Sequence, residues 1–171
     1  MSYPFTRAIA DDLRVLRLVY KLSTRALDAH VATLPPTQRS WETFDHADQY
    51  ILESTNEQLN RVVDSTVISA YQLLRTGWTV KETRFHRAEI IRRIEDRFGI
   101  DVTSFPGWNE VRDMTRDANA TKHRAGIHWE NDASGVAVFD GTVQLHRATV
   151  ERRIHGVGRW VRFFAATLPL S

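Results

Sequence analysis

A chain of 171 residues, of which 42% are hydrophobic and 26% charged, is long enough for one domain with a hydrophobic core and short for two. We therefore expect residues 1–171 to form a single domain. The absence of cysteine excludes disulfide bonds, thiolate zinc sites and a cysteine nucleophile. A formal net charge of +2 permits a nucleic-acid partner without requiring one.

The sequence shows no apolar segment of the kind that directs secretion or membrane insertion. Charged residues already occur at Asp11 and Asp12, and no stretch approaches the roughly 18 apolar residues of a membrane span. We therefore expect a cytoplasmic protein with no membrane partner.

Two long helices are predicted in the first half of the chain. Between about residues 8 and 33, apolar residues recur every three or four positions, which is the period of an amphipathic helix, and Pro35-Pro36 ends the pattern. A second helix is predicted from about residues 37–40 to residue 77. The polar cluster Ser54-Thr55-Asn56 leaves open a kink or a split in this second helix.

Two shorter helices are predicted next. The first covers about residues 82–98 and ends at Gly99, the residue type that most often follows a helix C-terminus. Ser104-Phe105-Pro106 is expected to open the second, because proline is tolerated in a first helical turn and serine can cap it. This helix is expected to end at about His123 or Arg124, before Gly126.

Strands are predicted only between residues 135 and 145, where β-branched residues flank Asp140-Gly141, a pair typical of tight hairpin turns. A last helix is predicted from about residue 148 to residue 167. The expected fold class is therefore all-α in the main: a helical bundle of four to five helices, with a small β-hairpin before the last helix.

Arginines gather in two of these segments. The first cluster comprises Arg84, Arg87, Arg92, Arg93 and Arg97, and the second comprises Arg147, Arg152, Arg153, Arg159 and Arg162. Because glutamate and aspartate are interspersed among them, we interpret both clusters as solvated helix faces.

The fourth predicted helix carries a polar stripe. At about 100° per residue, Arg116 and His123 fall within roughly 20° of each other, and Asn119 lies between them. Arg112 lies one turn earlier on the same stripe. The apolar residues on the opposite side, which we expect to face the core, are Val111, Met114 and Ala118.

An arginine, an amide and an imidazole on one stripe suit phosphate chemistry. Arginine holds a phosphate by a forked pair of hydrogen bonds, and histidine gives or takes a proton near neutral pH. Arg116, Asn119 and His123 are therefore candidates for binding or cleaving a phosphodiester. An ordinary solvated helix face would carry residues of the same kinds, and this interpretation stays open.

The segment from Arg116 to His123, RDANATKH, resembles the signature motif of the HEPN superfamily. That motif has an arginine, a polar residue directly after it and a histidine a few positions later, on a late helix of a small all-α domain. Six residues separate Arg116 from His123, the long end of the family's spacing, and the resemblance covers only this motif and its helical setting. It implies a homodimer in which two copies of the motif line one cleft. In active members it implies metal-independent RNA cleavage in toxin–antitoxin, antiviral or RNA-processing systems.

On this hypothesis His123 moves a proton to or from the attacking 2′-hydroxyl, and Arg116 stabilises the charge on the phosphorane. Asn119 orients either group, and Asp117 holds Arg116 or an active-site partner. The neighbouring basic residues expected to bind the substrate are Arg112, Lys122 and Arg124. No cofactor and no metal are expected.

Two other interpretations remain. The stripe is also consistent with a non-catalytic module that binds RNA, a nucleotide or a protein partner such as an antitoxin, or with a plain solvated surface on an interaction scaffold. A metal site is not expected, because His123, His128, Glu130 and Asp132 match no standard ligand spacing and straddle a predicted loop. The sequence contains no glycine-rich phosphate loop and no nucleophile elbow.

Overall fold

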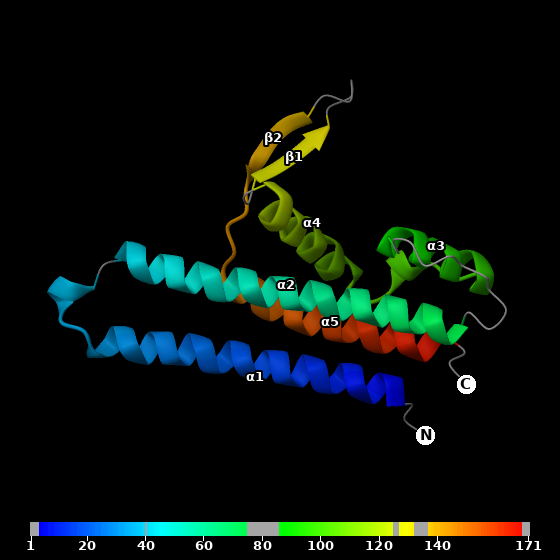
Figure 1. Cartoon of the computed structure of the whole chain (residues 1–171), viewed down its shortest axis with the longest axis horizontal. Coiled ribbons are helices and arrows are strands. Elements are labelled where there is room, and N and C mark those ends of the chain that lie inside the picture. Colours follow the sequence, from blue (N-terminus) through cyan, green and yellow to red (C-terminus); the bar gives the residue numbers. More distant parts are fainter. Residues whose placement is uncertain (1–3, 40, 75–85, 125–126, 132–136, 169–171) are drawn as a thin grey trace.

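The computed structural model describes residues 4–39, 41–74, 86–124, 127–131 and 137–168. In these ranges the chain is mainly α-helical, which confirms the predicted helical bundle (Figure 1). The α-helices are α1 (Pro4–Thr33), α2 (Trp41–Leu74), α3 (Arg87–Phe98), α4 (Trp108–Arg124) and α5 (Arg147–Thr167). Two short 3₁₀ helices, η1 (Pro36–Gln38) and η2 (Val102–Ser104), precede α2 and α4.

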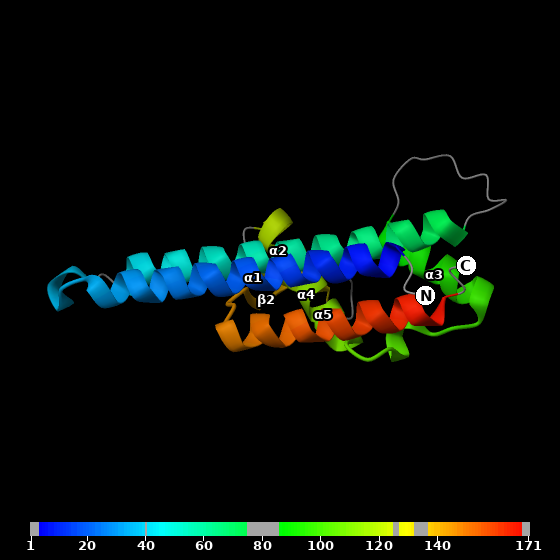
Figure 2. The same ribbon diagram turned by 90° about the horizontal axis from the view of Figure 1, so that it is seen from below.

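Helices α1 and α2 form a long antiparallel hairpin, and α5 lies along both of them (Figures 1 and 2). Helix α2 passes through Ser54-Thr55-Asn56 without a break. The Thr55 hydroxyl donates to the Ile51 carbonyl within the helix at 2.7 Å. Thr55 shares the Ile51 carbonyl with a backbone N–H of α2, and Asn56 directs its amide to another helix, so both side chains are satisfied and α2 is not split.

Helix α5 supplies much of the core, because it packs against α1, α2 and α4. Its Trp160 and Phe164 are fully buried and stack with ring centroids 4.8 Å apart. Trp108, at the start of α4, packs beside the same Trp160. We expect the burial of these large aromatic side chains between the helices to be the main source of the protein's stability.

The first turn of α5 is fastened to the long hairpin by Arg147. Its guanidinium donates to Asp28 on α1 at 2.8 Å and to Asp48 on α2 at 2.9 Å. The hydrogen bond from Arg147 holds the pKa of the Asp28 carboxyl below its ordinary value. Arg147 is therefore a partly buried anchor, and its interpretation as part of a solvated face was wrong.

Two glycines allow the segment before α4 to cross α5. Gly107 has a φ of 94°, and a Cβ there would lie 2.1 Å from the carbonyl oxygen of Gly156. A Cβ on Gly156 would in turn lie 2.6 Å from the side chain of Glu110. The close approach of the two backbones thus depends on the absence of side chains at both positions.

We expect Gly107→Ala to destabilise the protein more than Gly99→Ala. Both glycines have a positive φ, so alanine costs about 1–2 kcal/mol at either site from the left-handed backbone alone. A Cβ at Gly99 meets no atom within 4 Å, whereas one at Gly107 collides with backbone, which adds about 1–3 kcal/mol. Urea unfolding of the two variants measures the difference, and equal losses would contradict this account of the crossing.

The boundaries of α3 and α4 differ in part from the prediction. Gly99 follows α3 in the left-handed conformation, as predicted, whereas residues 82–85 of the predicted helix lie outside the described residues. Helix α4 begins at Trp108, so the predicted start at Ser104-Phe105-Pro106 was wrong. Asp101 accepts a hydrogen bond from the Thr103 amide and starts η2 instead, and Gly107 interrupts the helical backbone.

The hairpin predicted around Asp140-Gly141 is not found there. Both residues lie within strand β2 (Ala137–Thr142), which pairs antiparallel with β1 (Ile127–Asn131). His128 pairs with Gly141 and Trp129 pairs with Phe139, so Asp140 has no partner residue in β1. The Asp-Gly pair therefore forms an irregularity within β2 and not a turn. His128 therefore lies in a strand and not in the predicted loop.

Of the predicted second strand, just after Asp140-Gly141, only Thr142 belongs to a strand. Leu145 is buried, and its backbone is bound by the side chain of Gln49 on α2. The Gln49 amide donates to the Leu145 carbonyl at 2.7 Å, and its oxygen accepts from the Leu145 N–H at 3.4 Å. One amide side chain thus takes the place of a strand partner for this segment.

Candidate functional site

Helix α4 has one apolar face and one polar face, as its sequence predicts. Val111 and Met114 are fully buried and Ala118 nearly so, whereas Arg112, Arg116 and Asn119 are exposed. Position 123 belongs to the same helix, so its backbone continues the register of the stripe. The side chains of His123, Lys122 and Arg124 lie outside the described residues.

Asp117 lies on the inner side of the stripe. It is only 6% exposed, and its Oδ2 accepts a hydrogen bond from Nη2 of Arg153 on α5 at 2.5 Å. Its Oδ1 lies 3.7 Å from Nε of the exposed Arg116. Asp117 therefore contacts a buried arginine on one side and a stripe arginine on the other.

The buried arginine joins three helices. Arg153 is 5% exposed, and its Nη1 donates to Oδ1 of Asn56 on α2 at 2.9 Å. Asn56 in turn donates to the Met114 carbonyl on α4 at 3.2 Å. A charged and hydrogen-bonded network of Asn56, Asp117 and Arg153 thus lies directly beneath the polar face of α4.

The burial of Arg153 corrects the interpretation of the second arginine cluster. Arg153 lies three residues after Val150 and four before Val157, and both valines are fully buried. That spacing places it on the core side of α5. The spacing was a usable signal, but the neighbouring exposed arginines suggested a solvated face instead.

A cavity of about 450 Å³ lies beside the stripe, between α2, α3 and α4. Arg112 and Asn119 line it, together with Thr115 and with His86, the residue just before α3. Arg116 is not among its lining residues. The structure thus brings two stripe residues into one cavity with an imidazole that the sequence pattern had not singled out, because no local spacing connects His86 to α4.

The other cation of this cavity, Arg87, is already engaged. Its guanidinium donates to Asp64 at 2.7 Å, to the Thr115 hydroxyl at 2.6 Å and to the Asn60 side chain at 2.8 Å. The side chain is 15% exposed. Arg87 therefore anchors α3 to α2 and α4, and its interpretation as part of a solvated face was wrong. Arg112 is the more exposed cation of the cavity, and among the described residues it pairs only with the neighbouring, also exposed Asp113, at 3.2 Å.

The described residues contain no group of three or more His, Asp or Glu side chains placed to hold a metal ion. The side chains of His128 and Glu130, and Asp132 as a whole, lie outside them. None of the described helices is both long and apolar enough to cross a bilayer.

Exposed guanidinium groups and an amide on one rigid helix can bind a phosphate, and an imidazole beside them can transfer a proton. A buried network joins α4 to α2 and α5 and so fixes the position of the helix that carries these groups. Comparison of the chain with protein-family models, with curated proteins and with solved structures found no match. What the protein does is therefore inferred from the residues of the site alone.

Proposed function

We propose that the protein is a metal-independent endoribonuclease of a toxin or antiviral-defence type, acting as a homodimer through the polar stripe of α4. The observation that supports this best is the joint exposure of Arg116 and Asn119 on one face of α4, in register with His123. The resemblance of residues 116–123 to the HEPN motif points to the same chemistry.

In this mechanism the His123 imidazole takes the proton of a ribose 2′-hydroxyl, and the freed O2′ attacks the adjacent phosphorus. The bond from phosphorus to the 5′-oxygen breaks, and the leaving oxygen takes a proton from the partner subunit's His123. Arg116 stabilises the charge on the phosphorane by its forked donors, and Asn119 orients the attacking group. Arg112, Lys122 and Arg124 bind neighbouring phosphates. The products are a 2′,3′-cyclic phosphate and a 5′-hydroxyl.

Because one stripe supplies a single histidine, the mechanism needs a second copy to provide the acid when the first provides the base. We therefore expect a dimer at micromolar concentration in sedimentation velocity. A mixture of wild-type and His123→Ala chains should be less active than its share of wild-type chains alone would give, because each mixed dimer lacks one of the two histidines. A monomer that cleaves RNA would contradict this part of the proposal.

A second candidate function is non-catalytic binding of RNA, a nucleotide or a protein such as an antitoxin. One observation favours it: Arg112 and Asn119 share the cavity of about 450 Å³ with His86, whereas Arg116 does not line it. A nucleotide phosphate bound between Arg112 and Asn119 would use this cavity without any need for His123.

The experiment that separates the two functions incubates purified protein with end-labelled single-stranded RNA in excess EDTA. Endoribonuclease activity predicts cleavage that persists in the chelator, because every group of the mechanism is a side chain. Binding without cleavage would support the second function. Cleavage that disappears in EDTA and returns with magnesium would contradict the first.

A further inference from the structure

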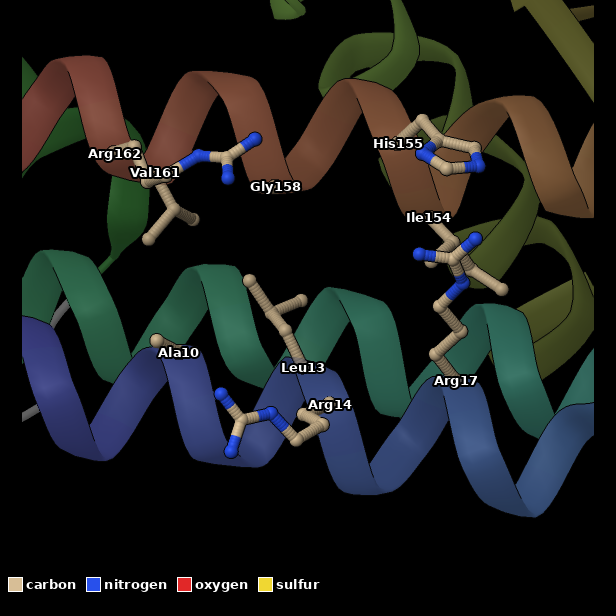
Figure 3. A pocket seen from close by; sticks show the side chains of 9 residues that line it. All are labelled: Ala10, Leu13, Arg14, Arg17, Ile154, His155, Gly158, Val161 and Arg162. Carbon is tan, nitrogen blue, oxygen red and sulfur yellow. The ribbon is translucent and has the colours of Figure 1, made fainter.

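A second basic surface lies on the side of the bundle away from α4. Figure 1 shows α1 and α4 on opposite sides of α2 and α5, and Figure 2 shows α1 and α5 side by side. Between α1 and α5 is a groove of about 460 Å³ (Figure 3). Its apolar lining includes Leu13, Ile154 and Val161. This volume lies within the usual range of ligand-binding clefts.

The rim of this groove is cationic. Arg14 and Arg17 approach from α1, and His155 and Arg162 approach from α5. In Figure 3 the side chain of Arg17 extends from α1 toward the α5 side, where His155 lies. None of the described residues that line the groove is acidic. Three arginines from two helices, with one imidazole beside them, thus gather around one apolar cleft.

These cations are poorly neutralised within the described part of the chain. Arg14 has one loose pair, 3.6 Å from Asp11, in which both side chains are more than half exposed. Neither Arg17 nor Arg162 forms an ion pair with a described residue, in contrast to Arg87 and Arg147, which are bound by carboxylates. An anion in the groove would relieve the repulsion between them.

The positive charge continues past the groove along α1. On α1, Lys21 lies one turn after Arg17 and is exposed. On α5 the positive charge ends at His155, because Glu151 lies one turn before it and Arg159 contacts Glu110 on α4 at 3.7 Å, away from the groove. Arg14, Arg17 and Lys21 span about two turns of α1 opposite Arg162 on α5, and such an array suits a ligand with repeated negative charges better than one small anion.

We propose that the α1–α5 groove binds the backbone of single-stranded RNA, with phosphates at Arg17, Arg162 and His155 and bases against the apolar lining. Grooves that combine cations with apolar surface can hold the phosphates of a single strand while its bases rest on the apolar lining. A bilayer surface fits less well, because these cations surround a recess between two helices that a strand can enter and a membrane cannot. The proposal does not depend on cleavage at α4.

The test measures binding of a fluorescent 2′-O-methyl RNA oligonucleotide, which lacks the 2′-hydroxyl needed for cleavage, by anisotropy at several salt concentrations. The double variant Arg17→Gln/Arg162→Gln should bind on the order of tenfold more weakly. The plot of the logarithm of the binding constant against the logarithm of the salt concentration should become less steep by about 0.7 for each lost phosphate contact. The control Arg61→Gln/Arg93→Gln, which removes two exposed arginines on α2 and α3, changes the net charge equally and should bind nearly as the wild type does.

A second pair of variants leaves every arginine in place. Gly158 lines the groove, and a Cβ there would meet only Leu13, at 3.9 Å. Gly158→Glu should weaken RNA binding clearly more than the similarly sized Gly158→Gln, because only glutamate adds a negative charge. The proposal would be overturned if Arg17→Gln/Arg162→Gln weakened RNA binding no more than Arg61→Gln/Arg93→Gln does, and Gly158→Glu no more than Gly158→Gln. Binding of the wild type to phosphatidylserine vesicles, lost in Arg17→Gln/Arg162→Gln, without binding to RNA would also overturn it. If the protein does not cleave RNA at α4, the results expected from these two binding comparisons stay the same.

Discussion

Replacing His123 by alanine is expected to lower the rate of RNA cleavage by about 10²–10⁴-fold, the usual contribution of a positioned proton-transfer group. Position 123 continues the exposed stripe of α4 by helical register, so the free energy of unfolding should change little. Rates from single-turnover cleavage of labelled RNA, with urea unfolding of the same preparations, measure both quantities.

The matched control is His46→Ala, which removes an exposed histidine from α2. It should leave the cleavage rate unchanged. If His46→Ala and His123→Ala cleave equally fast, His123 transfers no proton in the reaction. Arg116→Lys provides a second check, because lysine keeps the charge but loses the forked geometry, and it should slow cleavage where Arg61→Lys does not.

Replacing Arg153 by methionine is expected to reduce the free energy of unfolding by about 3–5 kcal/mol, because the carboxylate of Asp117 would stay buried without this cation. The two side chains are 7% and 9% exposed, so water cannot replace the lost partner. Asn56 would lose a hydrogen bond in the same step. Urea unfolding measures the loss.

Arg93→Met is the matched control, since Arg93 pairs with Glu89 on the surface of α3, where both side chains are more than 40% exposed. The free energy of unfolding should fall much less in Arg93→Met than in Arg153→Met, because water screens an exposed ion pair and can replace the lost partner. The double variant Arg153→Met/Asp117→Leu removes both charges and should recover a large part of the stability lost in Arg153→Met. Equal losses in Arg153→Met and Arg93→Met would contradict the structural role given to the buried network.

The parts of the fold that the sequence predicted are those set by local spacing. Val111, Met114 and Ala118 recur at helical intervals, so the sides of α4 could be assigned without knowing what packs against them. Gly99 ends α3 because a left-handed residue is needed immediately after the helix. In both cases the physical cause lies within a few residues of the effect.

The errors arose where distant residues decide the outcome. The turn preference of Asp140-Gly141 was overridden by pairing with β1 and by the binding of Leu145 to Gln49, which lies 96 residues earlier. The contact of Arg153 with Asn56 likewise spans 97 residues. His86 enters the cavity beside α4 only because Arg87 fastens α3 to α2 and α4. No local pattern carries such information.

The central claim, that the stripe of α4 cleaves RNA by attack of a 2′-hydroxyl, is tested most directly with an oligonucleotide carrying 2′-deoxyribose at the scissile position alone. The mechanism predicts that the all-ribose RNA is cut in EDTA to leave a 2′,3′-cyclic phosphate, identified by mass spectrometry. It also predicts that the substituted RNA remains intact at that position while it still binds. Equal cleavage of the two RNAs at that position would contradict the claim.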